Sequence, residues 1–375
     1  MGNLFRRMKL SEIGQIVAGG TPKTKIEEYW NGDVPWITPK DLSSHAGMYI
    51  SRGERNISQV GLDNSSAKLL PKGTVLFTSR APIGYVAIAR NEVTTNQGFK
   101  SIIVNDEHDN IFTYYLLKNN IDIIENHANG STFKEISGSV MKSLEFGIPS
   151  LREQKAIAHI LSTLDDKIEV NNEINKTLEN MAQAYFDDMF PNVAAGDTTI
   201  GEYITPKRGK NLLSKDAISG EVPVIAGGLS PATYHNVSNT QSPVITISAS
   251  GANAGFVNLW TVPVWSSDSS FIDYGMTKDV YFWYVMLKKR QKEIYDSQTG
   301  SAQPHIYPKH ITIMPTIKLN VDEINLYTKR VTPLFKKIAN NLYEISKLQL
   351  IRDTLLPKLM SGEIRVPLKT EGDAS

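Results

Sequence analysis

Two long stretches of the chain place their apolar residues at alternating steps of three and four, which is the spacing of a heptad repeat. In the first stretch the repeated positions are Leu161, Leu164, Ile168, Asn171, Asn175, Leu178, Ala182, Tyr185 and Met189. A displacement of 170 residues leads to the second set, Val331, Leu334, Ile338, Asn341, Ile345, Leu348, Arg352, Leu355 and Leu359. The pattern predicts two long helices with the same phase, over residues 150–191 and 320–366.

The ends of these helices are predicted from capping residues and prolines. Ser150 precedes the first helix, Glu153 follows at the spacing of a capping box, and Pro191 ends the helix. Pro357 lies late in the second helix, so this helix is expected to kink or break before the segment MSGEIRV. The polar residues 367–375 are expected to form a flexible tail.

The segments outside the helices also match each other at this displacement. GTVLFTSRAPIGYVAIA (73–89) lies over SPVITISASGANAGFVNL (242–259), and both read as strand, small-residue turn and strand. NIFTYYLLKNN (110–120) lies over VYFWYVMLKKR (280–290), and both have helical spacing. Because several matches occur in the same order, we interpret the chain as a tandem duplication of one module. The predicted fold class is α+β, with mixed globules over residues 1–149 and 192–319 and a pseudo-two-fold internal repeat.

Neither long helix can bury its apolar seam alone, so the two are expected to pack together as an antiparallel coiled coil. Asn171 and Asn341 occupy equivalent heptad positions and would meet near the pseudo-two-fold axis, where a polar pair fixes register. The alternative is that an asparagine at the edge of the seam is solvated. The residues expected to set the register of the helices are Leu161, Leu164, Ile168, Asn171, Leu178, Val331, Leu334, Ile338, Asn341 and Leu348.

Composition narrows the class of protein. Hydrophobic residues make up 41% and charged residues 21%, and no apolar run is long enough to span a bilayer. The N-terminal MGNLFRRMKL carries two arginines without a following apolar segment, so a signal peptide is not predicted. The absence of cysteine excludes disulfides and thiolate zinc sites. We expect a cytoplasmic protein that does not contact a membrane.

Charge alone does not identify a polyanionic partner, because the net charge is only +1. Nucleic-acid binding must therefore rest on local basic clusters, such as TPKRGKNLLSK over residues 205–215. Such runs are more often solvated surface than binding sites.

Sequence signatures of catalysis are missing. The glycine pairs in VAGGTPK and IAGGLSP form neither GxxxxGK[ST] nor GxGxxG, and no HExxH is present. REQK (152–155) contains a Glu-X-Lys, but it lies on the predicted helix without the upstream acidic residue that a nuclease needs. We therefore predict no catalytic residue and no metal site, and these absences favour a binding function.

Polar and basic loops lie at matching places in the two modules. Small residues in GGTPKT and TPKRGKN would let backbone amides approach a phosphate, and the lysines would neutralise it. Arginine and asparagine are suited to paired hydrogen bonds with guanine and adenine edges. The candidate DNA-binding residues are Thr21, Lys23, Arg80, Asn96, Gln97 and Lys100 in the first module and Lys207, Arg208, Lys210, Asn253, Ser269 and Gln303 in the second.

Together these segments resemble the specificity subunit of type I restriction-modification enzymes. The likeness rests on LSEIGQIVAGGTPKT, PWITPKDL, GTVLFTSRAPIGYVAIA, TNQGF, the long segment from GIPSLREQKAIAHIL to AYFDDMF, and LIRDTLLPKLMSGEIRV. It covers nearly the whole chain, and the interior of the second module is its weakest part. There SASGANAG replaces SRAPIG, so a contact inferred at Arg80 has no counterpart.

The resemblance implies two target recognition domains, each reading one half of a bipartite site in double-stranded DNA, held apart by the two helices. It also implies that the helices and their register residues dock two modification subunits, which bind S-adenosylmethionine and methylate adenine. Two restriction subunits that use ATP and magnesium would join the complex, so these cofactors belong to the partners. Two other hypotheses remain: a structural repeat scaffold that bridges proteins, and a nuclease whose site is assembled only in space.

Overall fold

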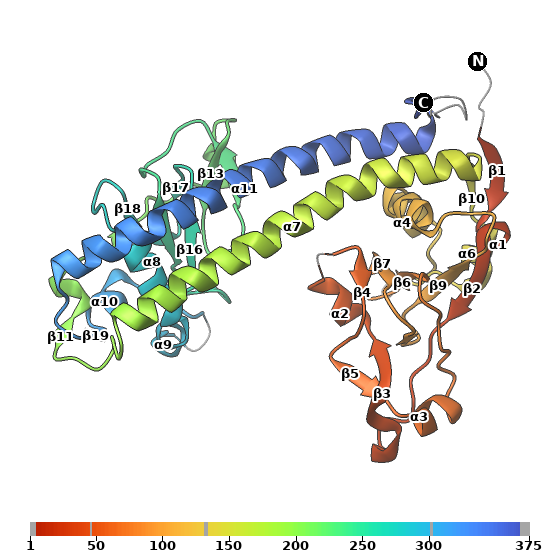
Figure 1. The fold of residues 1–375 in the computed structure, drawn as a ribbon, viewed down its shortest axis with the longest axis horizontal. Coiled ribbons are helices and arrows are strands. Elements are labelled where there is room, and N and C mark those ends of the chain that lie inside the picture. Colours follow the sequence, from red (N-terminus) through yellow and green to blue (C-terminus); the bar gives the residue numbers. More distant parts are fainter. Residues whose placement is uncertain (1–4, 46, 131–133, 301–302, 368–375) are drawn as a thin grey trace, which may run out of the picture. The chain divides into compact units, whose positions relative to one another are not determined.

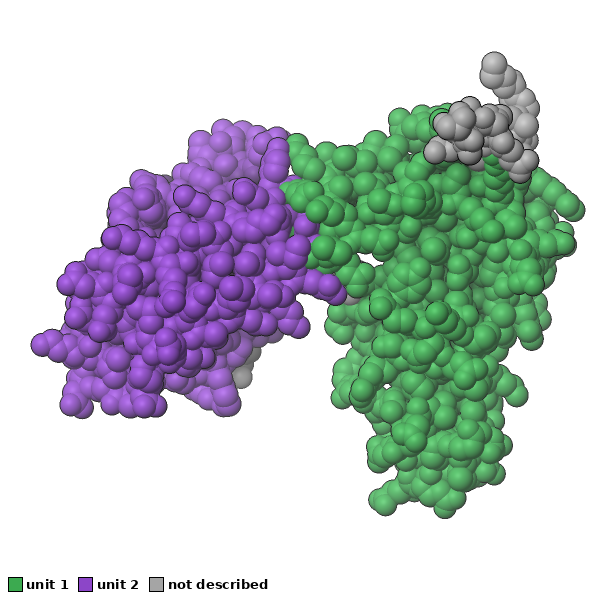
Figure 2. Space-filling view, viewed as in Figure 1, with its two compact units in different colours: residues 1–170, 344–375 green, residues 171–343 purple. Residues whose placement is uncertain are grey.

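The computed structural model describes residues 5–45, 47–130, 134–300 and 303–367, so most of the predicted tail lies outside the described residues. The chain forms two compact units, one of residues 1–170 with 344–375 and one of residues 171–343 (Figure 2). Two long helices, α7 (Leu151–Met189) and α11 (Val321–Ser361), contribute to both units (Figure 1). Each unit mixes strands and helices around a core of its own.

Three sheets occur among the described residues of the first unit. The largest has the order β2 (Gly14–Ala18), β9 (Lys100–Val104), β6 (Val75–Ser79), β7 (Ile83–Ala89), β4 (Tyr49–Ile50). A second sheet has the order β5 (Arg55–Ile57), β3 (Trp30–Ile37), β8 (Thr94–Thr95), and β1 (Arg6–Lys9) pairs antiparallel with β10 (Glu145–Ile148). The helices are α1 (Leu10–Ile13), α2 (Pro39–Ser43), α3 (Gln59–Asp63), α4 (Asn110–Asn119), α5 (Ile121–Asn126) and α6 (Gly138–Ser143).

Helix α4 is buried within the first unit and packs close to α7 (Figure 1). Residues 112–117 are all buried, which is the pattern of a helix that is covered on every side. Asp109 caps the helix, because its carboxylate accepts a hydrogen bond from Phe112 N at 2.8 Å. Leu161 of α7 and Leu359 of α11 belong to the same apolar cluster. The first unit is therefore built onto the N-terminal part of α7 and the C-terminal part of α11.

The second unit repeats this strand order. Its largest sheet is β12 (Lys207–Arg208), β18 (Ser269–Asp273), β15 (Val244–Ser248), β16 (Val257–Trp260), which corresponds to β2, β9, β6 and β7. The order β14 (Thr233–His235), β13 (Val222–Ile225), β17 (Trp265–Ser266) corresponds to β5, β3, β8, and β11 (Thr198–Thr199) pairs with β19 (Pro315–Thr316) as β1 does with β10. Its short helices are α8 (Val280–Lys289), α9 (Gln291–Asp296) and α10 (Pro308–Thr312).

Aromatic side chains dominate the core of the second unit. Phe186 of α7 and Phe190, which directly follows α7, pack against Phe282 of α8 and Tyr327 of α11, with ring centroids 5.0 to 6.0 Å apart. The Tyr327 hydroxyl donates to the carbonyl oxygen of Ala182 at 2.9 Å, which satisfies the only polar atom of that buried ring. The second unit is thus built onto the C-terminal part of α7 and the N-terminal part of α11.

Every predicted seam position of the two helices is buried or half-buried. In the first unit Asp165 of α7 pairs with Arg352 of α11 and Lys167 with Glu344, so the residue number rises on one helix as it falls on the other. The same holds in the second unit, where Asn175 pairs with Asn341 and Ala182 with Tyr327. Within each unit, then, the helices run antiparallel.

The predicted pairing of Asn171 with Asn341 needs correction. Asn341 Nδ2 donates to Asn175 Oδ1 at 2.8 Å, one helical turn along α7 from Asn171. Both Asn171 and Asn341 are fully buried, so the alternative of a solvated asparagine is also wrong. The heptad pattern located the polar layer but not its partners, because a shift of one turn keeps every seam position facing the other helix.

Two predictions about helix ends are also corrected. Helix α11 continues through Pro357 to Ser361, so the predicted break before Met360 does not occur, and Leu359 and Met360 are buried in the core of the first unit. A proline inside a helix costs about 3 kcal/mol, which such burial offsets. At the start of α7, Ser150 Oγ accepts from Glu153 N at 3.4 Å, but the buried Glu153 carboxylate binds the guanidinium of Arg365 at 2.6 and 2.8 Å. Only half of the predicted capping box is formed.

Candidate nucleic-acid interface

Four segments of the first unit meet beside the turn that joins β6 to β7. The segment after β2 is fixed by Gly20 N, which donates to Thr95 O at 2.8 Å. The turn itself is fixed by Ser79 N, which donates to Gly98 O at 2.7 Å, and the segment before α6 by Ile136 N, which donates to Ser79 O at 3.0 Å. The fold thus brings the loops that carry Thr21, Arg80, Asn96 and Glu135 together.

The glycine pair in this site packs closely against the rest of the protein. A Cβ atom on Gly19 would collide with the carbonyl oxygen of Asn96, and one on Gly20 with the backbone nitrogen of Ala67. Gly20 N already donates to Thr95 O, and Gly19 N is directed at Phe99 O at 3.5 Å. Because both amides point into the protein, glycine is required here for close backbone packing.

A single carboxylate, Glu135, joins two basic candidates of the first unit. Glu135 accepts from Arg80 Nη1 at 3.3 Å with one oxygen and from Lys100 Nζ at 3.4 Å with the other. The Arg80 side chain is 38% exposed, whereas Lys100 is only 9% exposed and lies 3.4 Å from Ser79 Oγ. Arg80 is thus presented at the surface, whereas Lys100 is a largely buried charge that balances Glu135, and its DNA contact stays a prediction.

The remaining candidates of the first unit are Thr21, Lys23, Asn96 and Gln97. The Thr21 hydroxyl donates to the side-chain oxygen of Gln97, which links two of the loops. Asn96 Oδ1 accepts from Gly98 N at 2.9 Å and so shapes its own turn. Gln97 and Lys23 are exposed. The surface therefore offers a guanidinium, two side-chain amides and a lysine.

The corresponding segments of the second unit also meet. Gly209 N donates to Ser269 O at 2.8 Å, which joins the end of β12 to β18. Ala249 N donates to Asp268 O at 3.1 Å, and Ile306 N donates to Ala249 O at 2.9 Å. The turn between β15 and β16 is thereby held against the β17–β18 loop and the segment before α10, in the same order of elements as in the first unit.

Here too a carboxylate holds an arginine. Asp268 Oδ1 accepts from Arg208 Nη2 at 2.6 Å, and its other oxygen accepts from the Ser250 hydroxyl. The Arg208 side chain is 42% exposed, and Lys207 and Lys210 beside it are exposed. Asn253 is half-buried in the β15–β16 turn, and Gln303 is exposed.

Ser269 does not belong to this surface, and its predicted DNA contact is wrong. Its side chain is fully buried, and its hydroxyl lies 2.8 Å from Ser266 Oγ and 3.2 Å from Ile225 O. All five residues of β18 are buried, so the strand is covered on both faces. Ser269 connects two sheets within the second unit and cannot reach a ligand at the surface.

Glu135 and Asp268 were missed by the sequence reasoning. Their positions in the repeat do not correspond: Glu135 follows β9, α4 and α5, whereas Asp268 lies between β17 and β18. No local motif marks either residue as the partner of an arginine that is 55 or 60 positions away. Only the folded arrangement of the loops identifies them.

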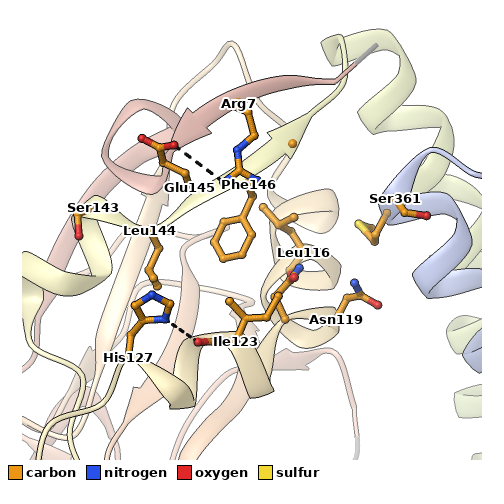
Figure 3. A pocket seen from close by; sticks show the side chains of 13 residues that line it. Arg7, Leu116, Asn119, Ile123, His127, Ser143, Leu144, Glu145, Phe146 and Ser361 are labelled. Atoms are coloured by element: carbon orange, nitrogen blue, oxygen red, sulfur yellow. Dashed lines mark hydrogen bonds and ion pairs between the residues drawn. The ribbon is translucent and has the colours of Figure 1, made fainter. Parts of the chain in front are cut away.

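A separate cavity of about 550 Å³ lies in the first unit among β1, β10, α4, α5 and the end of α11 (Figure 3). Arg7 and Glu145 approach to 4.0 Å on one side, and His127 Nδ1 lies 2.8 Å from the carbonyl oxygen of Ile123 on another. None of the candidate DNA-binding residues lines it.

The described part of the chain contains no cluster of three or more acidic or histidine side chains that could hold a metal ion. It also contains no helix long and apolar enough to cross a membrane.

The repeated sheets and paired helices are those of a known class of DNA-recognition subunits. Residues 4–180 match the family described as type I restriction modification DNA specificity domain. The MjaIX type I restriction enzyme specificity subunit of Methanocaldococcus jannaschii is 34% identical, over 96% of this chain and 93% of that protein. The chain belongs to the family of type I restriction-modification specificity subunits, and members of this family recognise the target without catalysing the reaction.

Further relatives support the same assignment. The type I specificity subunit of Mycoplasma genitalium is 28% identical over 90% of this chain and 96% of that protein. The EcoR124I/EcoR124II specificity subunit of Escherichia coli is 31% identical over 42% of this chain and 40% of that protein. The crystal structure of the S subunit from M. genitalium matches 96% of this chain and 97% of that chain with a TM-score of 0.63 and 23% identity, which shows a shared fold.

Proposed function

We propose that the chain reads a bipartite sequence in double-stranded DNA, with the surface around Arg80 contacting one half-site and the surface around Arg208 contacting the other. The observation that carries this proposal is the repetition of the surface: in both units, segments at the same places in the strand order meet and present an exposed arginine together with side-chain amides. The arginine comes from the β6–β7 turn in the first unit and from β12 in the second. Arginine can bond guanine O6 and N7, and asparagine or glutamine can bond adenine N6 and N7. In this proposal the two units are tandem target recognition domains.

Exposed lysines among the candidate residues of each unit would position the protein on the phosphate backbone. Lys23 is exposed in the first unit, and Lys207 and Lys210 are exposed in the second. Contacts between such ammonium groups and phosphates carry no sequence information, but they release counterions and strengthen binding at low salt. We therefore propose that these lysines strengthen DNA binding of any sequence, whereas the arginines distinguish one sequence from another.

The two long helices support a fixed gap between the half-sites. The boundary between the units falls after residue 170 within α7 and after residue 343 within α11, so both connections are helical. Two readers joined by continuous helices would recognise half-sites only at one separation and one rotational phase of the duplex. The proposal therefore includes a defined number of base pairs between the halves.

The helices also carry apolar side chains that point away from their seam. In the first unit Leu350 and Ile351 of α11 are 63% and 46% exposed, and in the second unit Leu342 and Tyr343 are 42% and 66% exposed. Exposed apolar groups that recur on one element mark surfaces for protein partners. We propose that these two positions dock two modification subunits, which would supply S-adenosylmethionine and the methylating site. Restriction subunits using ATP and magnesium would complete the assembly.

The proposal is tested by mapping N6-methyladenine in the DNA of cells that express the chain with its modification subunit, with and without the chain. We expect a motif of two short defined halves and a constant gap that disappears when the chain is deleted. A methylation pattern that does not depend on the chain would refute the proposal. It would then favour a scaffold that bridges proteins. Magnesium-dependent cleavage of DNA by the purified chain alone would instead indicate a nuclease.

A further inference from the structure

We infer that Glu135 and Asp268 are positioning residues that set the sequence discrimination of their half-sites by holding Arg80 and Arg208. The inference rests on the proposed DNA-reading function. In each unit one carboxylate contacts the arginine through a single terminal nitrogen, Arg80 Nη1 at 3.3 Å and Arg208 Nη2 at 2.6 Å. A guanidinium has five N–H donors, so the remaining ones stay available for a base edge.

The carboxylates are themselves fixed in place. The second oxygen of Glu135 is bound by Lys100, whose side chain is only 11% exposed. The second oxygen of Asp268 is bound by the Ser250 hydroxyl, and the backbone of Asp268 is held by Ala249 N at 3.1 Å. A side chain that is anchored at both ends restricts the plane of the guanidinium that it contacts. Such support from a neighbouring residue keeps a binding group in one productive geometry.

The two pairs are built from positions that do not correspond in the repeat. Arg80 comes from the β6–β7 turn and Arg208 from β12, while Glu135 precedes α6 and Asp268 precedes β18. The repetition of the module therefore does not by itself produce a pair in both units. The same arrangement from different positions indicates that an arginine with a carboxylate partner is what each recognition surface requires.

The electrostatic cost of these carboxylates also supports a role in sequence discrimination. An ion pair between partly exposed side chains contributes little to folding stability, and Arg80, Glu135, Arg208 and Asp268 are all 33% to 42% exposed. A negative charge on a DNA-binding surface also repels phosphates and so weakens binding to any sequence. The carboxylate instead increases sequence discrimination. It disfavours binding of the arginine to a phosphate, so the contact between the arginine and guanine becomes the more favourable one.

The test uses the full chain assembled with its modification subunits and duplexes that carry the mapped target, the target altered in either half, or a random sequence. The dissociation constant is measured by fluorescence anisotropy over a range of salt concentrations for wild type, Glu135→Gln, Asp268→Asn, Arg80→Ala and Arg80→Ala/Glu135→Gln. Glu145→Gln is the matched control, because it removes one carboxylate from an exposed pair in the same unit. Thermal unfolding of each variant verifies that it is folded.

For Glu135→Gln we expect tighter binding to the random duplex and about a tenfold loss of discrimination at the first half-site only, since a bidentate base contact carries discrimination of this size. Asp268→Asn should do the same at the second half-site. In the Arg80→Ala background, Glu135→Gln should cause no further loss. Unchanged discrimination in Glu135→Gln and Asp268→Asn would overturn the inference, as would equal losses at both half-sites from one substitution. A further loss in the double variant would also overturn it, because the carboxylate would then read a base itself. If wild type does not distinguish the target from random DNA, the proposed function fails as well.

Discussion

Replacing Arg352 by methionine should destabilise the first unit, because it breaks a nearly buried network between the two long helices and α4. Asp165 Oδ1 accepts from Arg352 Nη1 at 2.6 Å, and Asp165 Oδ2 accepts from the Tyr115 hydroxyl at 2.6 Å. Burial and the Asp165 carboxylate raise the pKa of Tyr115, so this hydroxyl stays protonated and remains a donor. Loss of the guanidinium leaves Asp165 with the tyrosine as its remaining partner in the network.

The expected loss of stability in Arg352→Met follows from how exposed the Arg352 and Asp165 side chains are. The side chains of Arg352 and Asp165 are 18% and 15% exposed, which lies between a solvated pair and a fully buried one. Removing one partner of a buried pair costs about 3–5 kcal/mol, whereas an exposed pair is worth about 0–1 kcal/mol. We therefore expect Arg352→Met to lower the free energy of opening by about 2–3 kcal/mol. Lys358→Met is the control in the same helix, since the Lys358–Glu363 pair is half-exposed and its loss should cost less than about 1 kcal/mol.

Native-state hydrogen exchange of the α4 amides is the appropriate assay, because a chain of two units need not unfold in one step. The triple variant Tyr115→Phe/Asp165→Leu/Arg352→Met removes the whole network and should be less destabilised than Arg352→Met alone. An Arg352→Met protein within about 0.5 kcal/mol of wild type would refute the reasoning. So would a triple variant whose loss equals the sum of the single losses.

Three further experiments probe the remaining features. Arg80→Ala should weaken binding of the assembled complex about tenfold on the intact target but leave the preference for the second half-site unchanged, and equal losses for both halves would contradict it. Leu350→Glu should lower the affinity for the modification subunit at least about tenfold in a titration, because Leu350 is exposed on α11. Gln349→Glu, on the same exposed stretch of α11, is the control and should not lower it. Equal affinities of Leu350→Glu and wild type would exclude the surface around Leu350 as the docking site. Asn175→Leu/Asn341→Leu should raise the melting temperature by about 2–4 °C, since it replaces a buried polar pair by apolar contact; a lower melting temperature would contradict it.

The long helices were the part of the fold that the sequence predicted best. A heptad pattern sustained over some 40 residues leaves one face of the helix apolar whatever the rest of the chain does. Every position assigned to the seam is indeed buried or half-buried. The predicted break of α11 before Met360 does not occur. It was predicted because proline disfavours a helix interior, but packing of Leu359 and Met360 in the core of the first unit keeps the helix continuous.

The candidate site could be predicted only in part. Turn residues such as Arg80 and Gln97 were found because loops between predicted strands face outward. Ser269 was assigned wrongly because a strand that is buried on both faces shows no alternation from which an outward side could be read. Glu135 and Asp268 could not be found at all, since their role depends on contacts between segments more than 50 residues apart.

The central claim is that two target recognition domains, held at a fixed separation, bind the two halves of one DNA target. Its most direct test is methylation by the assembled complex on duplexes in which the gap between the two mapped halves is native, one base pair shorter or one base pair longer. One base pair moves the second half by about 3.4 Å and turns it by about a tenth of a helical turn, which two readers on continuous helices cannot follow. The account predicts efficient methylation only at the native gap. Equal methylation at all three gaps would contradict it.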